Sequence, residues 1–498
     1  MELELQKNEL ICYETIGGGC IQGEETLETA IPEYCPDMAR LVDAVGQLYI
    51  KEKVAAQNRM TVRGEVKVTV LYTSEETAGL RTLSMTVPFT CISEDSRWEG
   101  CEKLWAYGRV LLVDARAVTS RKLYLKVIPE VCVMGYFKRT CQICEEIPSE
   151  QSLQVKKEKL QVNLLENVSE NEFSFMQDVM PAQEIIPEDL LAYRLSATVD
   201  SIQRVGKKAM LKGSLELEAL FRGSEQGLHT YNTVMPFSQI LDEAELPEDT
   251  ECAAQVQLCE GEARLLRTDA GCGFSVSARL RIFLCAYGKK EIFYIADLYS
   301  TEDETEVEQK MVRIPEEQIG KVMTKEMNQY LEFGQKVPFL YVLSMDCGQI
   351  SQRQSEGKIQ LAAVCRAKIL YLDENGVPLS TEKSEEIVME TEEISGGFCA
   401  CCHEAKITFS GDACQLRIPL SINMRNTVTL ELNTVGNVIT QEREKTGGPS
   451  LILRRMQSTE TLWDIAKQYR TKESLIREVN HMEEDSMPET MLLIPKVR

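Results

Sequence analysis

The chain has 498 residues, of which 43% are hydrophobic and 27% are charged. It is therefore long enough for several folded domains and too apolar to be mainly disordered. Lys and Arg total 55 against 78 Asp and Glu, which gives a formal net charge of −23. This balance excludes nucleic acid and anionic lipid as expected partners, because both are bound through clustered cations.

The start of the chain carries acidic residues where a secretory signal needs a basic leader and an apolar core. No apolar run reaches the roughly 18 residues of a membrane span. We therefore expect a cytoplasmic protein with no transmembrane segment. Its 18 cysteines are scattered along the chain, and we expect them to be reduced, as thiols in the cytosol normally are.

An alternating pattern of apolar and polar residues occurs three times along the chain. It runs over residues 62–72 and 211–221, and in a weaker form over 361–371. Such a period of two is typical of a strand that is buried on one face. An aromatic residue closes each copy, at spacings of 149 and 150 residues: Tyr72, Phe221 and Tyr371.

Other landmarks repeat at nearly the same interval. Val-Pro-Phe at 87–89 recurs as Met-Pro-Phe at 235–237, and each unit has a further alternating run near its end. The pattern predicts a mainly β protein with three tandem β-rich domains, each a sandwich or a partly open barrel. A short helix is also expected near residues 36–45. The predicted domains cover residues 1–143, 151–300 and 308–440, of which the third is divergent.

The last fifty residues have a different character. A polar segment at 441–450 predicts a linker, and residues 451–498 hold eight basic and eight acidic residues, so the negative excess lies before them. Thr461 with Asp464 three residues later predicts a capping box at the start of a helix. Thr471 is expected to cap a second helix, and apolar runs predict a strand on either side. The segment therefore reads as a small βααβ domain.

Two families are recognisable in these motifs. Residues 461–466 (Thr-Leu-Trp-Asp-Ile-Ala), with Asn480 and a final Leu-Ile-Pro at 493–495, resemble a LysM module. The preceding repeats resemble SPOCS domains, which are shared among spore coat and spore morphogenetic proteins. SPOCS repeats followed by one LysM module resemble the SipL-like family of spore-forming Clostridia.

The resemblance implies a protein of sporulation and spore coat morphogenesis that acts as a scaffold through protein–protein interaction. Its expected partners are a SpoIVA-like morphogenetic ATPase of the coat basement layer and other coat proteins. Its expected location is the cytoplasm of the mother cell, at the forespore surface. No cofactor and no enzymatic activity are implied.

The loops that flank the sugar groove of a LysM module depart from the usual pattern. Thr459-Glu460 stands where Gly-Asp is usual, and Pro488-Glu489-Thr490 stands where Pro-Gly-Gln is usual. Without glycine the backbone cannot approach a sugar closely, so we expect a protein ligand. The predicted partner-binding face comprises Thr459, Glu460, Thr461, Trp463, Asn480, Pro488, Glu489 and Thr490.

Two other interpretations remain at this stage. Trp463 lies on the helical stripe and can be a core residue instead of a ligand contact. The alternative function is a peptidoglycan- or N-acetylglucosamine-binding LysM protein of the spore cortex or cell wall, for which chitin oligomers are the natural probe.

Cysteine and histidine clusters are weak metal candidates. Zinc needs four converging soft ligands, and neither the Cys-x-x-Cys pair nor the Cys/His cluster supplies four, so no metal is predicted. No nucleophile elbow, phosphate loop or His-Glu-x-x-His motif is present, so no catalytic residue is predicted. The weak metal candidates are Cys141, Cys144, Cys399, Cys401, Cys402 and His403.

Overall fold

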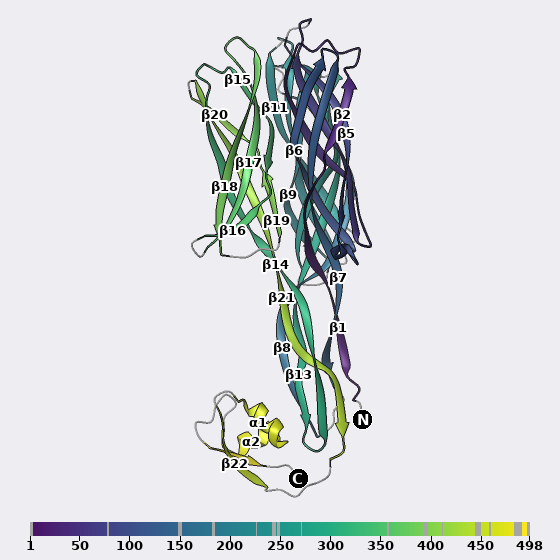
Figure 1. Cartoon of the computed structure of the whole chain (residues 1–498), viewed down its shortest axis with the longest axis vertical. Helices are drawn as coiled ribbons and strands as arrows, with labels where there is room; N and C mark the ends of the chain where they lie inside the picture. The colour runs from purple at the N-terminus through teal and green to yellow at the C-terminus, as the bar shows by residue number, and fades with distance from the viewer. Residues whose placement is uncertain are drawn as a thin grey trace.

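The structure, a computed structural model, consists almost entirely of β-strands, which confirms the mainly β class. Figure 1 shows a broad body, a narrow stalk below it and a small helical module beside the far end of the stalk. The structure describes residues 3–76, 79–147, 152–181, 185–225, 227–241, 246, 250–269, 271–355, 358–392, 397–410, 412–443, 450–457, 460–482 and 491–495.

The first part of the chain forms lobe 1 (residues 3–147). A three-stranded sheet of β3, β4 and β5 packs against a sheet in which β1, β2 and β6 all pair with the long strand β7. Valines of β4 and β7 fill the space between the two sheets. The elements are β1 (Gln6–Gln22), β2 (Glu25–Ala30), β3 (Arg40–Ala56), β4 (Arg59–Thr73), β5 (Leu80–Glu94), the 3-10 helix η1 (Ser96–Trp98), β6 (Lys103–Thr119) and β7 (Lys122–Glu146).

Lobe 2 (residues 152–300) has the same order of elements. Strands β9, β10 and β11 form a three-stranded sheet, and β8, β12 and β13 continue the long-strand sheet of lobe 1 through a bridge between Tyr13 and Leu165. The core lies between the sheets. The strands are β8 (Leu153–Val179), β9 (Pro187–Val205), β10 (Lys208–Gly223), β11 (Leu228–Leu241), β12 (Thr250–Thr268) and β13 (Gly271–Ser300).

Lobe 3 (residues 304–441) repeats the plan with shorter strands. β15, β16 and β18 pair with β17, while β19, β20 and β14 pair with β21, and a third core fills the space between these sheets. Figure 1 shows this lobe in green beside lobes 1 and 2. The strands are β14 (Glu304–Glu332), β15 (Phe339–Cys347), β16 (Ser351–Ser355), β17 (Lys358–Leu372), β18 (Pro378–Thr391), β19 (Gly397–Cys402), β20 (Lys406–Ser410) and β21 (Ala413–Gln441).

The repeated Gly and Pro-Phe motifs meet across the strands of lobes 1 and 2. Gly64 pairs with Phe89, and Gly213 pairs with Phe237. A Cβ on Gly64 would lie 2.2 Å from the carbonyl oxygen of Tyr49 and 2.7 Å from the Phe89 ring. The ring thus covers a strand glycine whose backbone is closely approached from the next strand, and this explains why the two motifs recur together.

The segment expected to be a short helix is not helical. Residues 31–39 form a loop, and β3 begins at Arg40 and pairs with β4 along its whole length. The Arg121 guanidinium holds the loop by donating to the carbonyl oxygens of Ile31, Pro32 and Cys35. Residues 40–45 make the hydrogen bonds of strand β3 and residues 36–39 lie in the loop, so the prediction of a helix at residues 36–45 is wrong.

The three lobes share buried contacts. Tyr341 of lobe 3 is 5% exposed, packs with Leu71 and Leu220 of the other lobes, and donates a hydrogen bond to the Glu218 carbonyl oxygen at 3.3 Å. Lys368 pairs with Asp43 at 3.0 Å between lobes 3 and 1. The body is therefore a single packed unit.

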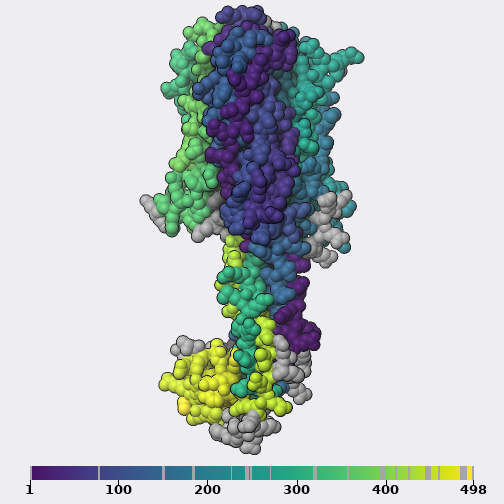
Figure 2. All heavy atoms as spheres, turned by 45° about the vertical axis from the view of Figure 1, so that its right-hand side comes forward, coloured from purple at the N-terminus to yellow at the C-terminus, as the bar shows by residue number. Residues whose placement is uncertain are grey.

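The stalk (residues 3–13, 138–147, 153–164, 288–317 and 428–441) consists of the ends of six long strands. β1 pairs with β7, β8 with β13, and β14 with β21, and their apolar faces form two further clusters. Figure 2 shows the stalk as a narrow column below the broad body.

The C-terminal module (described residues 450–457, 460–482 and 491–495) has the order strand, helix, helix, strand. Its elements are β22 (Leu451–Arg455), α1 (Leu462–Tyr469), α2 (Glu473–Val479) and β23 (Met491–Pro495), and β22 pairs with β23. The core contains Leu462, Ile465 and Ile476. Arg470, at φ 54°, ends α1 in the left-handed conformation.

Candidate functional site

Helix α1 begins with the capping box that the sequence predicts. The Thr461 hydroxyl accepts from the Asp464 backbone N–H at 3.2 Å, and the Asp464 carboxylate accepts from the Thr461 N–H at 2.9 Å. Hydrogen bonds from Thr461 lower the pKa of Asp464.

The prediction that Thr471 caps the second helix is wrong, because Lys472 is the N-cap of α2. Thr471 is buried between the two helices, and its carbonyl oxygen accepts a hydrogen bond from the Tyr299 hydroxyl.

One face of α1 docks on the stalk. Trp463 Nε1 donates to Asp297 Oδ2 at 2.8 Å, and Lys467 Nζ contacts both carboxylate oxygens of Asp297 at 2.7 and 2.8 Å. Residues 463 and 467 are one helical turn apart, so both side chains reach the same carboxylate. Figure 1 shows the end of β13 next to the module.

An aromatic pair extends this contact. The rings of Tyr299 and Trp463 meet edge to face with centroids 4.9 Å apart, and the Tyr299 hydroxyl donates to the Thr471 carbonyl oxygen at 2.7 Å. Burial raises the pKa of Tyr299. Arg470 pairs with Glu304 at 3.1 Å beside it. The module is thus fixed to β13 and β14 by two aromatic rings and two ion pairs.

The other described residues of the predicted partner face bond within the module. Glu460 accepts from the Arg454 guanidinium and from the Gln457 backbone N–H. The Asn480 side chain donates to the carbonyl oxygens of Ile476 and Leu493 at 2.7 Å and accepts from the Leu493 N–H at 2.8 Å, which ties α2 to β23. Thr459, Pro488, Glu489 and Thr490 lie outside the described residues.

Sequence reasoning missed Asp297 and Tyr299. Both lie in the second repeat, far from the module in sequence, where they continue an ordinary strand pattern. The only local signal is an acidic residue between the buried Ile295 and Leu298. It indicates a polar contact but names no partner.

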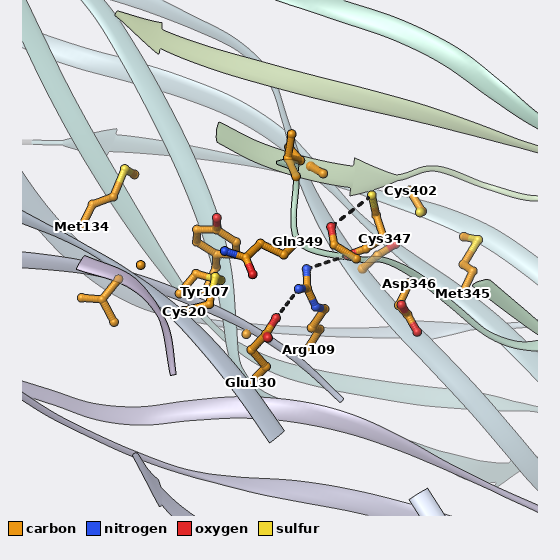
Figure 3. Close-up of a pocket in the computed structure, with 18 of the residues that line it drawn as sticks. Cys20, Tyr107, Arg109, Glu130, Met134, Met345, Asp346, Cys347, Gln349 and Cys402 are labelled. Carbon is orange, nitrogen blue, oxygen red and sulfur yellow. Dashed lines mark hydrogen bonds and ion pairs between the residues drawn. A yellow bond between two sulfur atoms is a disulfide. The ribbon is translucent and has the colours of Figure 1, made fainter. Parts of the chain in front are cut away.

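A second candidate site is a cavity of about 460 Å³ where the three lobes meet. Strands β1, β6 and β7 of lobe 1 form one wall, and β9 with the segments around Cys347 and Cys402 form the rest. Figure 3 shows Arg109 between Glu130 and Cys347. Arg109 is ion-paired with Glu130, which is 3% exposed, and donates to the Cys347 carbonyl oxygen at 2.7 Å.

Sulfur atoms line this cavity unusually densely. Cys20 and Cys132 form a disulfide, Met134 and Met345 face the same space, and Cys347 and Cys402 lie on the lobe 3 side. The expectation that all cysteines are free is wrong for Cys20 and Cys132: they are 112 residues apart, but the pairing of β1 with β7 places them opposite each other.

The four predicted metal candidates whose side chains the structure describes do not converge on one point. Cys141 and Cys144 belong to different apolar clusters of the stalk, because residues three apart on a strand face opposite sides. Contact with the Cys12 thiol lowers the pKa of Cys141 to about 7. Cys402 and His403 line the central cavity instead, where His403 Nε2 shares a hydrogen bond with Ser421 at 2.7 Å. The side chains of Cys399 and Cys401 lie outside the described part.

Comparisons with protein-family models, curated proteins and solved structures give no match for this chain. Within the described residues, neither helix has the length and apolar character needed to cross a bilayer.

Proposed function

We propose that this chain is a non-enzymatic adaptor of spore coat assembly of the SipL-like kind. The three lobes act as a scaffold, and the C-terminal module binds a SpoIVA-like ATPase of the coat basement layer. The protein acts in the mother-cell cytoplasm at the forespore surface, where it helps to localise the coat.

The observation that carries the proposal is the placement of two separate bodies at opposite ends of a stalk. The lobes lie at one end and the module at the other (Figure 2). Such an arrangement suits a protein that holds two partners apart, since each end has its own surface.

The module also has its own interior. The described core of the module takes a single residue, Tyr299, from the rest of the chain. The remaining contacts are polar pairs at its edge, such as Lys467 with Asp297. A folded unit attached in this way suits partner binding. We assign the contact to Thr459 and residues 488–490 of the predicted partner-binding face, since Trp463 faces the stalk.

Co-purification from sporulating cells tests this assignment. The full-length chain is compared with a chain that ends at Gln441, which keeps the three lobe cores and the stalk. We expect the SpoIVA-like ATPase to co-purify with the full-length chain only, and a fluorescent fusion of that chain to form a shell around the forespore.

Two results would contradict the proposal. Equal recovery of the ATPase with the shortened chain would place the contact in the lobes. Binding of chitooligosaccharides by the full-length chain with a Kd below about 1 mM would favour the cortex or cell-wall alternative.

A further inference from the structure

Three potential metal ligands meet in the wall of the central cavity. The Sγ atoms of Cys20 and Cys132 and a carboxylate oxygen of Glu130 all lie within 4.8 Å of one another. Cys132 and Glu130 are buried, while Cys20 is half-buried and lines the cavity. The three groups therefore face a space that a small ion can enter.

Strand geometry fixes these ligands. Glu130 and Cys132 are two residues apart on β7, so their side chains point to the same face. Cys20 is the direct cross-strand partner of Cys132, and Gln22 is that of Glu130. The ligands thus stand on one hydrogen-bonded ladder whose spacing does not depend on a flexible loop.

The Glu130 carboxylate is held by two partners but can still accept further bonds. Gln22 Nε2 donates to Glu130 Oε1 at 2.9 Å, and Arg109 pairs with Oε2. A carboxylate has about four lone-pair sites, so sites for a metal remain. With both sulfurs deprotonated, the charges of two thiolates and Glu130 are balanced by Arg109 and a divalent cation. A buried site with no net charge avoids the main cost of placing ions in a protein interior.

We propose that the reduced protein binds a zinc ion through the Cys20 and Cys132 thiolates and the Glu130 carboxylate. The fourth position opens to the cavity and is filled by water. Two thiolates and a carboxylate are ordinary zinc ligands, with bonds of about 2.0–2.3 Å, and the three ligand atoms here already lie within 4.8 Å of one another.

The disulfide is the alternative state of the same two sulfurs. A small-molecule disulfide, such as oxidised glutathione, accepts the two electrons: the Cys20–Cys132 bond forms, the glutathione S–S bond breaks, and two glutathione thiolates and the zinc ion leave. Metal binding and the protein disulfide therefore exclude each other, which links zinc occupancy to the thiol–disulfide balance of the compartment.

The Cys347 thiol on the lobe 3 side of the cavity is a poorer ligand. Cys347 is hydrogen-bonded to Cys365, and this contact together with burial raises the pKa of the Cys347 thiol. Cys365 belongs to the lobe 3 core and is 1% exposed. Thiolate formation at Cys347 therefore opposes both burial and the existing hydrogen bond.

Cobalt and zinc titration of the full-length chain tests the proposal. The chain is reduced with a phosphine and freed of metal, and Co²⁺ is added. We expect one Co²⁺ per chain with thiolate charge-transfer absorption, and complete displacement of Co²⁺ by one Zn²⁺. Oxidised glutathione is expected to release one Zn²⁺ for every two protein thiols lost.

Single variants locate the ligands. Cys20→Ser and Cys132→Ser are expected to weaken Zn²⁺ binding by more than the roughly tenfold to hundredfold that loss of an outer-shell partner costs. Cys347→Ser and Cys402→Ser are matched controls from the same cavity and are expected to bind Zn²⁺ normally. Circular dichroism identifies any variant that fails to fold, and Glu130→Asp then replaces it, with weakened binding expected.

The proposal is wrong if the reduced chain binds no metal or if Cys20→Ser binds Zn²⁺ as well as the unsubstituted chain does. It is also wrong if only Cys402→Ser loses Zn²⁺ binding, because the metal would then be bound by the lobe 3 thiols.

Discussion

At the scale of single residues, one carboxylate does most to hold the C-terminal module in place. Asp297 accepts hydrogen bonds from both Trp463 and Lys467, and its local sequence pattern does not identify these partners. An aspartate in a long strand is expected to face solvent, and only the return of the chain from 166 residues away gives it partners. Contacts of this kind depend on tertiary structure and cannot be read from neighbouring residues.

We predict that Asp297→Ala releases the module without unfolding it. The substitution leaves Trp463 Nε1 and the Lys467 ammonium without their acceptor, and such groups then prefer water. The emission of Trp463 should shift to longer wavelength as its ring becomes exposed to water. The shift can be assigned to Trp463, because Trp98 and Trp105 are buried in lobe 1 and their emission should not change. Cleavage in the 442–450 segment should become faster.

Glu302→Gln is the matched control, because this residue is exposed and lies close to Asp297, in the connection between β13 and β14. Its fluorescence and cleavage rate should equal those of the unsubstituted chain. An Asp297→Ala chain that behaves like this control would show that the Tyr299 contacts and the Arg470–Glu304 ion pair suffice to hold the module.

At the scale of elements, the strands of the lobes could be predicted because their pattern is local. Alternation over residues 62–72 and 211–221 reports burial on one face, and both segments lie within strands of the structure. The capping box at Thr461 was predictable for the same reason. The loop at 31–39 was not, because it is held by Arg121 from a distant turn.

The strand glycines give the second prediction. Gly64→Ala should destabilise lobe 1 by about 3 kcal/mol or more, because the added methyl meets the Tyr49 carbonyl oxygen as well as the Phe89 ring. Hydrogen exchange of the β3–β5 amides, followed with increasing urea, measures the local free energy of unfolding.

Two controls make this prediction specific. Phe89→Ala should not rescue Gly64→Ala, because the Tyr49 carbonyl remains in place. Gly100→Ala meets no atom within 4 Å and should cost less, since only its positive φ of 77° is strained. Equal losses for Gly64→Ala and Gly100→Ala would contradict the role given to the close backbone approach.

At the scale of the whole molecule, the spacing of the repeated motifs can be read from the sequence, but the assembly of the lobes cannot. A spacing of about 150 residues indicates three copies, yet nothing in it shows that the long strands of lobes 1 and 2 join in one sheet. The central cavity also depends on this assembly, while the Cys20–Cys132 pair depends on the register of β1 with β7 within lobe 1. Both features are set by the register between strands that are distant in the sequence, and this register cannot be read from a single sequence.

The third prediction concerns the contact between lobes. Tyr341→Ala should separate the unfolding of lobe 3 from that of lobes 1 and 2, because it removes a buried ring from the cluster that joins them, at a cost of about 3–5 kcal/mol. Calorimetry should then show an additional transition at lower temperature.

Tyr341→Phe is the control, since it removes only the hydrogen bond to Glu218 and should cost about 1 kcal/mol. A Tyr341→Ala chain that still unfolds in the same steps as the Phe variant would show that the remaining apolar and polar contacts suffice to couple the lobes.

The length of β13 has a mechanical consequence. This strand runs for 30 residues, roughly 100 Å, from the interior of lobe 2 to Asp297 and Tyr299, and it is paired along its course with β8. A force that pulls the two ends of the protein apart acts parallel to these strands and loads their hydrogen bonds together in shear. The molecule is therefore suited to bear tension as a stiff tether between whatever its two ends hold.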